Sequence, residues 1–307
     1  MEIFQLLNDG VRAGQGGVLA TITELVGPGP RSLGSHMAVT EEGRSAGSFS
    51  SGCVETAIIA EALDVLKDGK PKTVRFGLGS PYFDIRLPCG GGMDILFQPH
   101  PDGATIRQLV SRLEGREKVL LKLDPAGSVE LAFEAKASSA AWINGRFYVP
   151  HFPQLRLMLV GHGAEMLTTL KLAVSLGLSI NLFSPDPDIV GVGRAEGIEC
   201  RLLKTPDSPV NLQGDPWTAF LFLFHDHDWE PPLIAGALAA QSFWVGAMGS
   251  PRTHQARREA LAAFGVPSNQ IARIKGPVGL IPNTRDPATL ALSALAEIVG
   301  TYRDLNK

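Results

Sequence analysis

An apolar run that ends on a glycine turn constrains the fold of this chain more than any other feature. Residues 155–160 (LRLMLV) have the composition of a buried strand, Gly161-His162-Gly163 follows directly, and a helical pattern continues to Ser175. This order opens a Rossmann-type βαβ unit. We therefore predict a Rossmann-like domain with a mostly parallel sheet over residues 155–307.

The dinucleotide-binding version of this unit requires residues that the sequence supplies only in part. Met166 stands at the third glycine position of the fingerprint. The next predicted strand, residues 179–183, ends at Ser184, where a ribose-binding acid is expected, and Asp186 comes two residues later. The pattern therefore supports the fold more strongly than it supports binding of NAD(P).

Two later strand ends in this half carry polar or glycine-rich sequence. The apolar strand 219–224 ends on His225-Asp226-His227-Asp228, and the strand 242–245 leads into a turn that contains Gly249, Ser250 and Arg252. The carboxyl ends of parallel strands face the ligand crevice, so both segments are candidate binding elements. The histidines and aspartates could hold a metal, form a polar crevice edge or cap a helix. The glycine turn opens a helix that carries Arg257 and Arg258, and is a candidate anion site.

A last helix is expected to begin at Asp286-Pro287, with the aspartate as its cap and proline in its first position. Apolar residues at helical spacing predict one stripe on this helix that packs in the core: Leu292, Leu295, Ile298, Val299 and Tyr302.

The N-terminal half, residues 1–150, reads as a separate α+β domain, with residues 150–153 as the linker. A short amphipathic helix and a strand over 17–26 are followed by an exposed loop of alternating glycine and proline. This loop presents Arg31, Ser32 and His36. It suits an oxyanion such as phosphate; the alternative is a solvated loop with a surface arginine.

A small-residue turn, Gly47 to Glu55, enters a predicted amphipathic helix that reaches about Leu66. Ser50, Ser51 or Gly52 is the expected cap, which places Cys53 in the first turn, where a thiol loses its proton more easily. The alternative is a small, inert packed cysteine. Cys89, followed by three glycines from Gly90, has the same two interpretations, whereas Cys200 is expected in a core strand.

Composition excludes several classes of function. A length of 307 residues suits two domains, and a net charge of −3 offers no general attraction to nucleic acid or to an anionic membrane. No segment approaches the ~20 apolar residues that span a bilayer. Three distant cysteines do not form a disulfide framework, and we expect a reducing cytoplasm.

Taken together, these motifs resemble the xanthine dehydrogenase accessory factor family, XdhC/CoxI, in the family's order and over nearly the whole chain. The segments that carry the resemblance are Gly27-Pro28-Gly29-Pro30-Arg31, Gly34 to Met37, Gly47 to Glu55, Cys89-Gly90-Gly91-Gly92, Gly161-His162-Gly163, His225-Asp226-His227-Asp228, Gly246-Ala247-Met248-Gly249-Ser250 and Ile274 to Gly279. The sequence departs from the family at Ser51-Gly52-Cys53, where Gly-Gly-Cys is common, at Ser184 and at Ile281-Pro282.

The resemblance implies a protein that binds molybdenum cofactor (molybdopterin), assists its sulfuration and inserts it into a xanthine dehydrogenase-type molybdoenzyme. This role, holding a cofactor and passing it on, requires no turnover chemistry of the Cys53 thiol. The implied partners are that enzyme and a cysteine desulfurase, and a homodimer is expected. The alternative functions are an NAD(P)-dependent oxidoreductase and a metal-dependent hydrolase at His225 and His227.

We predict one cofactor site between the domains, to which Arg31, the Gly47–Gly52 turn, Cys53 and Cys89 contribute. Cys53 is the expected ligand of the molybdenum. The full set of predicted cofactor-binding residues is Arg31, Ser32, Gly47, Ser50, Gly52, Cys53, Glu55, Cys89, Gly90, Gly161, Gly163, His225, Gly249, Ser250 and Arg252.

Overall fold

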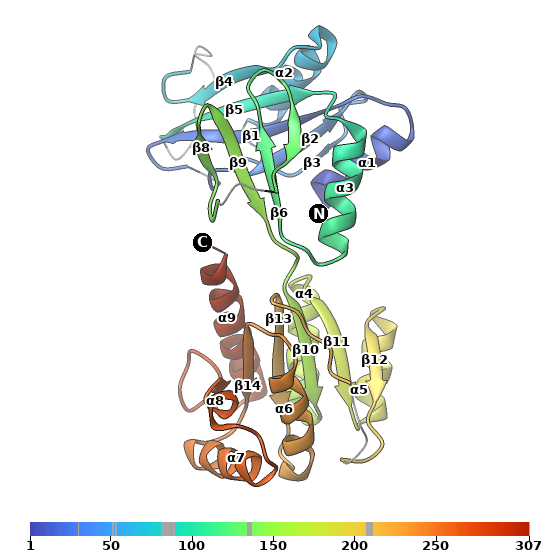
Figure 1. Cartoon of the computed structure of the whole chain (residues 1–307), viewed down its shortest axis with the longest axis vertical. Helices are drawn as coiled ribbons and strands as arrows, with labels where there is room; N and C mark the ends of the chain where they lie inside the picture. The colour runs from blue at the N-terminus through green and yellow to red at the C-terminus, as the bar shows by residue number, and fades with distance from the viewer. Residues whose placement is uncertain are drawn as a thin grey trace. The chain divides into compact units, whose positions relative to one another are not determined.

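The structure is a computed structural model that describes residues 1–29, 31–50, 52, 54–80, 87, 90–133, 137–206 and 211–306, apart from the side chain of His227. The chain divides into two compact units, Met1–Pro153 and Gln154–Lys307 (Figure 1), and each unit has its own apolar core. Within the described residues, no helix combines the length and the apolar character that crossing a membrane requires.

The first unit contains two antiparallel sheets and three helices. One sheet has the strand order β3-β2-β1-β5-β4 and the other β7-β6-β9-β8. In chain order the elements are α1 (Glu2–Arg12), β1 (Gly17–Val26), β2 (His36–Thr40), β3 (Ser45–Ala46), α2 (Glu55–Asp68), β4 (Lys72–Gly77), β5 (Gly92–Pro99), α3 (Gly103–Glu114), β6 (Val119–Leu123), β7 (Val129–Leu131), β8 (Ala141–Ile143) and β9 (Arg146–His151).

Strand β1 is buried on both of its faces, because successive side chains of a strand point in opposite directions. Val18 and Ile22 pack with Ile58 of α2 in one apolar cluster. Leu19, between them, packs in a second cluster with α1, α3 and the four-stranded sheet. The centre of the five-stranded sheet is therefore covered on both sides.

The second unit is one parallel sheet between two layers of helices. The strand order β12-β11-β10-β13-β14-β15 reads 3-2-1-4-5-6 along the unit, which is the Rossmann order. Its elements are β10 (Arg156–Gly161), α4 (Gly163–Ser175), β11 (Ser179–Ser184), α5 (Pro187–Ala195), β12 (Glu199–Leu202), β13 (Thr218–Leu223), η1 (His227–Trp229), α6 (Glu230–Ala239), β14 (Trp244–Ala247), α7 (Pro251–Ala263), α8 (Ser268–Ile271), β15 (Ile274–Lys275) and α9 (Pro287–Leu305).

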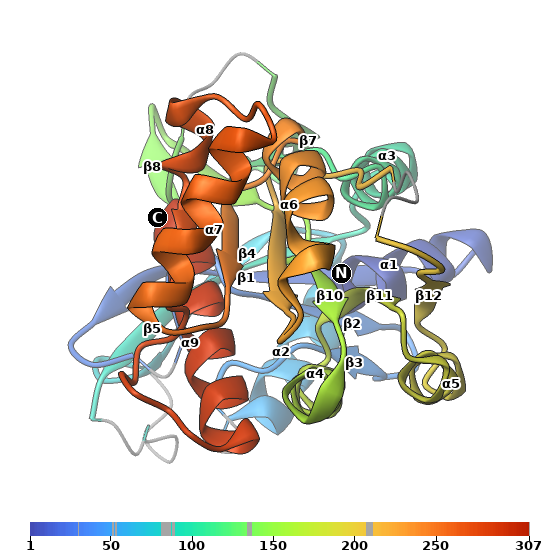
Figure 2. The same ribbon diagram turned by 90° about the horizontal axis from the view of Figure 1, so that it is seen from below.

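Alternate residues of the central strands divide between the two helix layers. Leu157 and Leu221 pack with α4, α5 and α9, whereas Met158 and Phe220 pack with α6, α7 and α8. Helices α6 and α7 lie side by side on their face of the sheet (Figure 2). Because the helices cover both faces of the sheet, the segments that follow β10, β11, β13 and β14 all lie at one edge, at the carboxyl ends of the strands.

The predicted fold class is confirmed: antiparallel sheets with helices are followed by a Rossmann-like parallel domain. Three local predictions were wrong. His36 is not presented by an exposed loop; it begins β2 and is only 6% exposed, because strand pairing with β1 draws it into the core. Helix α2 begins at Glu55 rather than before Cys53, and Leu292 of the predicted apolar stripe on α9 is 56% exposed.

Candidate functional site

The described part of the segment 47–54, here called the cysteine loop, curls around the carboxylate of Glu55. Oε1 accepts hydrogen bonds from Ser48 Oγ at 2.7 Å, Ser50 N at 2.7 Å and Phe49 N at 3.1 Å. Oε2 accepts from Ser50 Oγ at 2.6 Å and Gly52 N at 2.8 Å. Val54 N contacts the same oxygen at 3.3 Å and Ser50 Oγ at 3.1 Å. The loop conformation therefore depends on one side chain at the start of α2.

These hydrogen bonds set the charge of Glu55. Burial alone would raise the pKa of this carboxyl, but hydrogen bonds from Ser50 and Ser48 outweigh that effect and lower the pKa to about 2. Glu55 is therefore ionised at neutral pH. It occupies the position where the backbone N–H groups before a helix would otherwise bind an anion.

Arg31 connects the cysteine loop to the glycine-proline loop. Its Nε donates to the Ser48 carbonyl at 3.1 Å, and both Arg31 and its neighbour Ser32 are exposed. The glycine run after residue 89 approaches the same glycine-proline loop, because a Cβ at Gly91 would lie 2.0 Å from the Pro28 carbonyl oxygen. Only glycine fits there. Contacts among described residues thus bring three predicted segments together.

The two cysteines predicted for this site, together with Ser51, lie outside the described residues. Their neighbours in the sequence are described. Gly52 and Val54, on either side of Cys53, both donate to Glu55. Gly90, after Cys89, is exposed and donates to the Leu87 carbonyl at 2.9 Å. The roles assigned to Cys53 and Cys89 stay predictions.

In the second unit, the segment 161–163, here called the first glycine turn, lies where the strand order of the sheet reverses. Strands β10 and β13 are neighbours at this point, and ligands of open α/β sheets bind at such positions. A Cβ at Gly161 would lie 2.2 Å from the Leu223 carbonyl oxygen, so the close approach of the two strands requires glycine. His225, which follows β13, lies beside this turn and is exposed.

Glu165 in the first turn of α4 makes this position acidic. Its Oε2 lies 3.0 Å from His225 Nε2. Burial raises the pKa of Glu165, but the hydrogen bond with His225 outweighs that effect and the pKa is lowered overall. At the end of β11, Ser184 accepts from Asp186 N at 3.1 Å, and Asp186 caps α5. Ser184 and Asp186, the polar residues nearest the expected ribose position, therefore already make hydrogen bonds within the protein.

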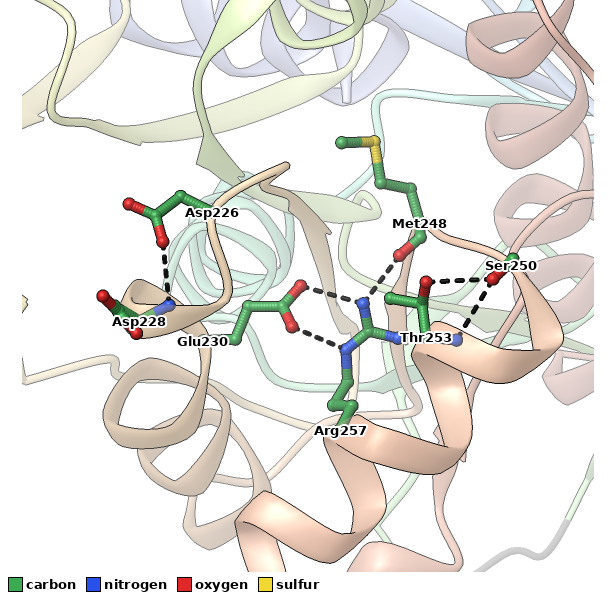
Figure 3. A network of polar contacts seen from close by, with 7 residues as sticks. All are labelled: Asp226, Asp228, Glu230, Met248, Ser250, Thr253 and Arg257. Atoms are coloured by element: carbon green, nitrogen blue, oxygen red, sulfur yellow. Dashed lines mark hydrogen bonds and ion pairs between the residues drawn. The ribbon is translucent and has the colours of Figure 1, made fainter.

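The segment 246–250, here called the second glycine turn, opens α7 at the end of β14. Ser250 caps the helix by accepting from Thr253 N at 3.1 Å, and Arg252 is exposed on its first turn. Beneath the turn, Arg257 of α7 forms a bidentate ion pair with Glu230 of α6, with both N–O distances at 2.9 Å (Figure 3). The pair holds the two helices together in the interior.

Glu165, Glu230 and the bonding role of Glu55 were not predicted from the sequence. The spacing of Glu55 from Ser48 and Ser50 could have indicated a loop closed by its own carboxylate, but such closure depends on backbone curvature that spacing alone does not specify. Among the described residues there is no group of three or more His, Cys, Asp or Glu side chains that could hold a metal ion.

Comparison with known proteins gives consistent family matches along the chain. A family model described as the XdhC Rossmann domain matches residues 157–298, and a model of the XdhC and CoxI family matches residues 11–77. The molybdenum cofactor insertion chaperone PaoD of Escherichia coli (strain K12) is 34% identical over 296 residues, which cover 96% of this chain and 86% of the relative.

Two further proteins are similar over most of their length. A protein of Bacillus subtilis (strain 168), described as a probable xanthine dehydrogenase subunit, is 23% identical over 93% of both chains. A crystal structure of a protein described as a xanthine dehydrogenase from Bacillus halodurans superposes with a TM-score of 0.76 at 22% identity, covering 99% of this chain and 96% of that one. This structural likeness shows the fold.

Proposed function

The chain belongs to the XdhC and CoxI family, and we therefore propose that it binds molybdenum cofactor and delivers it to a molybdenum hydroxylase of the xanthine dehydrogenase type. One observation carries the proposal: the 34% identity with a molybdenum cofactor insertion chaperone extends over 96% of this chain. The proposal includes help with sulfuration of the cofactor, with a cysteine desulfurase as sulfur donor, and a homodimeric carrier.

The donor set around the cysteine loop suits this cargo. Molybdenum cofactor offers a phosphate, a polar pterin and a soft dithiolene-bound metal, and a cysteine thiolate suits a soft metal or a transferable sulfur. Among its described contacts, Arg31 donates only through Nε, so its terminal N–H groups can reach an anionic oxygen. Glu55 holds the backbone on both sides of Cys53. In this scheme Arg31 and Cys53 bind the cargo, and Glu55 positions Cys53.

The proposal is tested by purifying the protein from cells that make the cofactor and from cells that cannot. Molybdenum by mass spectrometry and pterin by fluorescence should both accompany the protein from the first strain only. The purified protein should then restore activity to an apo-molybdenum hydroxylase. A preparation from cofactor-producing cells that holds neither molybdenum nor pterin would contradict the proposal.

An NAD(P)-dependent oxidoreductase is the second candidate, because the strand order of the second unit is that of dinucleotide-binding domains. Two features of the same unit argue against it. Glu165 places a carboxylate in the first turn of α4, where a pyrophosphate would bind. Ser184 provides no acid at the ribose position, and Asp186 is used as a helix cap. We therefore rank this function second.

A further inference from the structure

The two glycine turns of the second unit differ in the charged residue on the first turn of the helix that each one opens. Both lie at carboxyl ends of strands in one sheet, after β10 and β14, and each opens a helix of 13 residues. The first turn has the ionised Glu165 at the helix start. The second turn has no acidic residue in the first turn of its helix and carries Arg252 there. A phosphate would be repelled at the first position and attracted at the second.

The backbone of the second turn offers several donors. The N–H groups of Gly249, Ser250 and Arg252 make no hydrogen bond to any residue that the structure describes. The Thr253 N–H is already taken by the Ser250 side chain. Gly249, Ser250 and Arg252 are all exposed residues. Together they form the usual cradle for an anion at a helix N-terminus.

A second, independent feature points to a ligand at the same place. Arg257 is only 4% exposed and is aimed at the underside of the turn: Nη2 donates to the Met248 carbonyl at 2.7 Å, and a Cβ at Gly249 would lie 3.5 Å from Nη2 (Figure 3). Its Nη1 is buried and has no partner among the described residues. A buried charged donor without a partner is costly, and a bound water or a ligand oxygen is the ordinary remedy.

We propose that the phosphate of the bound cofactor is held at the second glycine turn by the N–H groups of Gly249, Ser250 and Arg252. Beneath them Arg257, whose charge is paired with Glu230, offers the one nitrogen of its guanidinium, Nη1, that has no partner among the described residues. The first glycine turn, which holds the pyrophosphate in dinucleotide-binding domains, is closed to phosphate by Glu165. The identification of the phosphate as that of molybdenum cofactor rests on the proposed function; the anion site itself rests on the structure.

The test is a titration of the full-length, isotope-labelled protein with inorganic phosphate, followed by backbone amide NMR. Saturable shifts are expected at Gly249, Ser250 and Arg252, and none at Gly163 to Glu165. Arg252→Gln should weaken the apparent affinity roughly two- to fivefold, as expected for one exposed ion pair. Arg258→Gln removes the same charge from an exposed position further along α7 and should leave the affinity unchanged.

Three outcomes would overturn the inference: saturable shifts at the first turn instead of the second, an equal loss of affinity in both arginine variants, or no saturable shift at all. An equal loss in both variants would indicate a general attraction of phosphate to the positive charge of α7. The absence of a saturable shift would mean that the turn has no specific phosphate site. Molybdenum and pterin content of the wild-type protein separates the two proposals. If cofactor is bound but phosphate shifts the first turn, only this inference fails. If phosphate shifts the second turn and no cofactor is found, only the proposed function fails.

Discussion

At the scale of single residues, the Glu55 carboxylate accepts hydrogen bonds from backbone and hydroxyl donors of the cysteine loop. We expect Glu55→Gln to lower the free energy of unfolding by about 1–3 kcal/mol, because an NH₂ group would then face other donors. Urea unfolding measures the change. Glu114→Gln, at an exposed position on α3, is the matched control and should change stability by less than about 0.5 kcal/mol. Equal effects of the two variants would contradict this role for Glu55.

A contact between two histidines, the buried His36 and the partly buried His151, is expected to make the stability of the first unit depend on pH. His36 Nε2 lies 3.2 Å from His151 Nε2, Thr21 Oγ1 contacts His36 Nδ1 at 2.7 Å, and the Phe4 ring packs against both histidines. Burial, then the charge of His151 and of the N-terminal amine, lowers the pKa of His36 well below 6.5. Burial and the N-terminal amine lower the pKa of His151 to about 4.

A lowered histidine pKa means that the unfolded chain takes up protons first as the pH falls. The contribution of these two neutral histidines to the free energy of unfolding should therefore be fully present above pH 6.5. It should decrease as the pH falls from 6.5 toward 4. Hydrogen exchange of the β2 and β9 amides, measured across this range, reports the change. His151→Gln should be less stable at neutral pH and should lose less stability on acidification. Parallel pH profiles for the two proteins would refute this account.

The proposed role of Cys53 has a matched control in the same chain. Cys53→Ala should lose the molybdenum that accompanies the purified protein and should no longer activate the target enzyme, because the soft ligand is removed. Cys200→Ala removes a half-buried thiol in β12 and should retain both properties. Tight cofactor binding and full activation by Cys53→Ala would show that the assignment is wrong.

Residue types at the site were predictable from the sequence, but their partners were not. Arg31 was expected to face a ligand, and its link to the Ser48 carbonyl appeared only in the structure. His36 was assigned to the exposed loop because glycine and proline precede it, yet it pairs with Thr21 in β1. Such pairings depend on where a distant strand passes, and local composition does not contain that information.

At the scale of elements, α5 and the turn that follows it contain two glycines with open space around them. One has a helical backbone and the other has a left-handed one. A Cβ at Gly191, inside the helix, or at Gly197, just after it, would meet no atom within 4 Å, and Gly197 has φ +72°. Gly191→Ala should therefore raise the free energy of unfolding by about 0.5–1 kcal/mol. Gly197→Ala should lower it by about 1 kcal/mol, because an L residue is strained in the left-handed region. Thermal unfolding compares the two variants, and changes of the same sign would contradict the backbone explanation.

Periodicity and capping patterns predicted most elements of the second unit. Asp286 followed by proline was expected to begin a helix, and Asp286 does cap α9 by accepting from Thr289 N. Strand β14 begins at Trp244, two residues later than predicted, because the chain enters the sheet only where it pairs with β13. Leu292 fits the apolar spacing of α9 but lies beyond the edge of the core. Sequence periodicity marks a face of a helix, not how far the opposing layer extends.

At the scale of the whole molecule, the parallel sheet was predictable and the antiparallel sheets were not. In the second unit, strands that pair in the sheet are mostly close to one another in the sequence. In the first unit, β1 pairs with β2 and also with β5, so that Leu19 lies opposite Gln98. Pairing over such a separation depends on packing of both faces, which no short pattern records.

The strand order of the second unit favours dinucleotide binding, whereas the side chains at the carboxyl ends of its strands oppose it. We expect calorimetric titration of the full-length protein with NAD⁺ and with NADPH to show no saturable binding up to about 1 mM ligand, because Glu165 opposes the pyrophosphate and Asp186 caps α5. Glu165→Gln removes the repulsion and is expected to bind more tightly than the wild type. Micromolar binding by the wild type would instead favour the oxidoreductase.

The Glu55 arrangement has a thermodynamic consequence for a carrier. Because the protein's own carboxylate orders the described part of the cysteine loop, the conformational entropy of that segment is lost during folding and not again when the cargo arrives. Loading then requires little reorganisation of the loop, and unloading releases none. If the protein carries the proposed cofactor, the cost of ordering this loop does not reduce its affinity for that cargo.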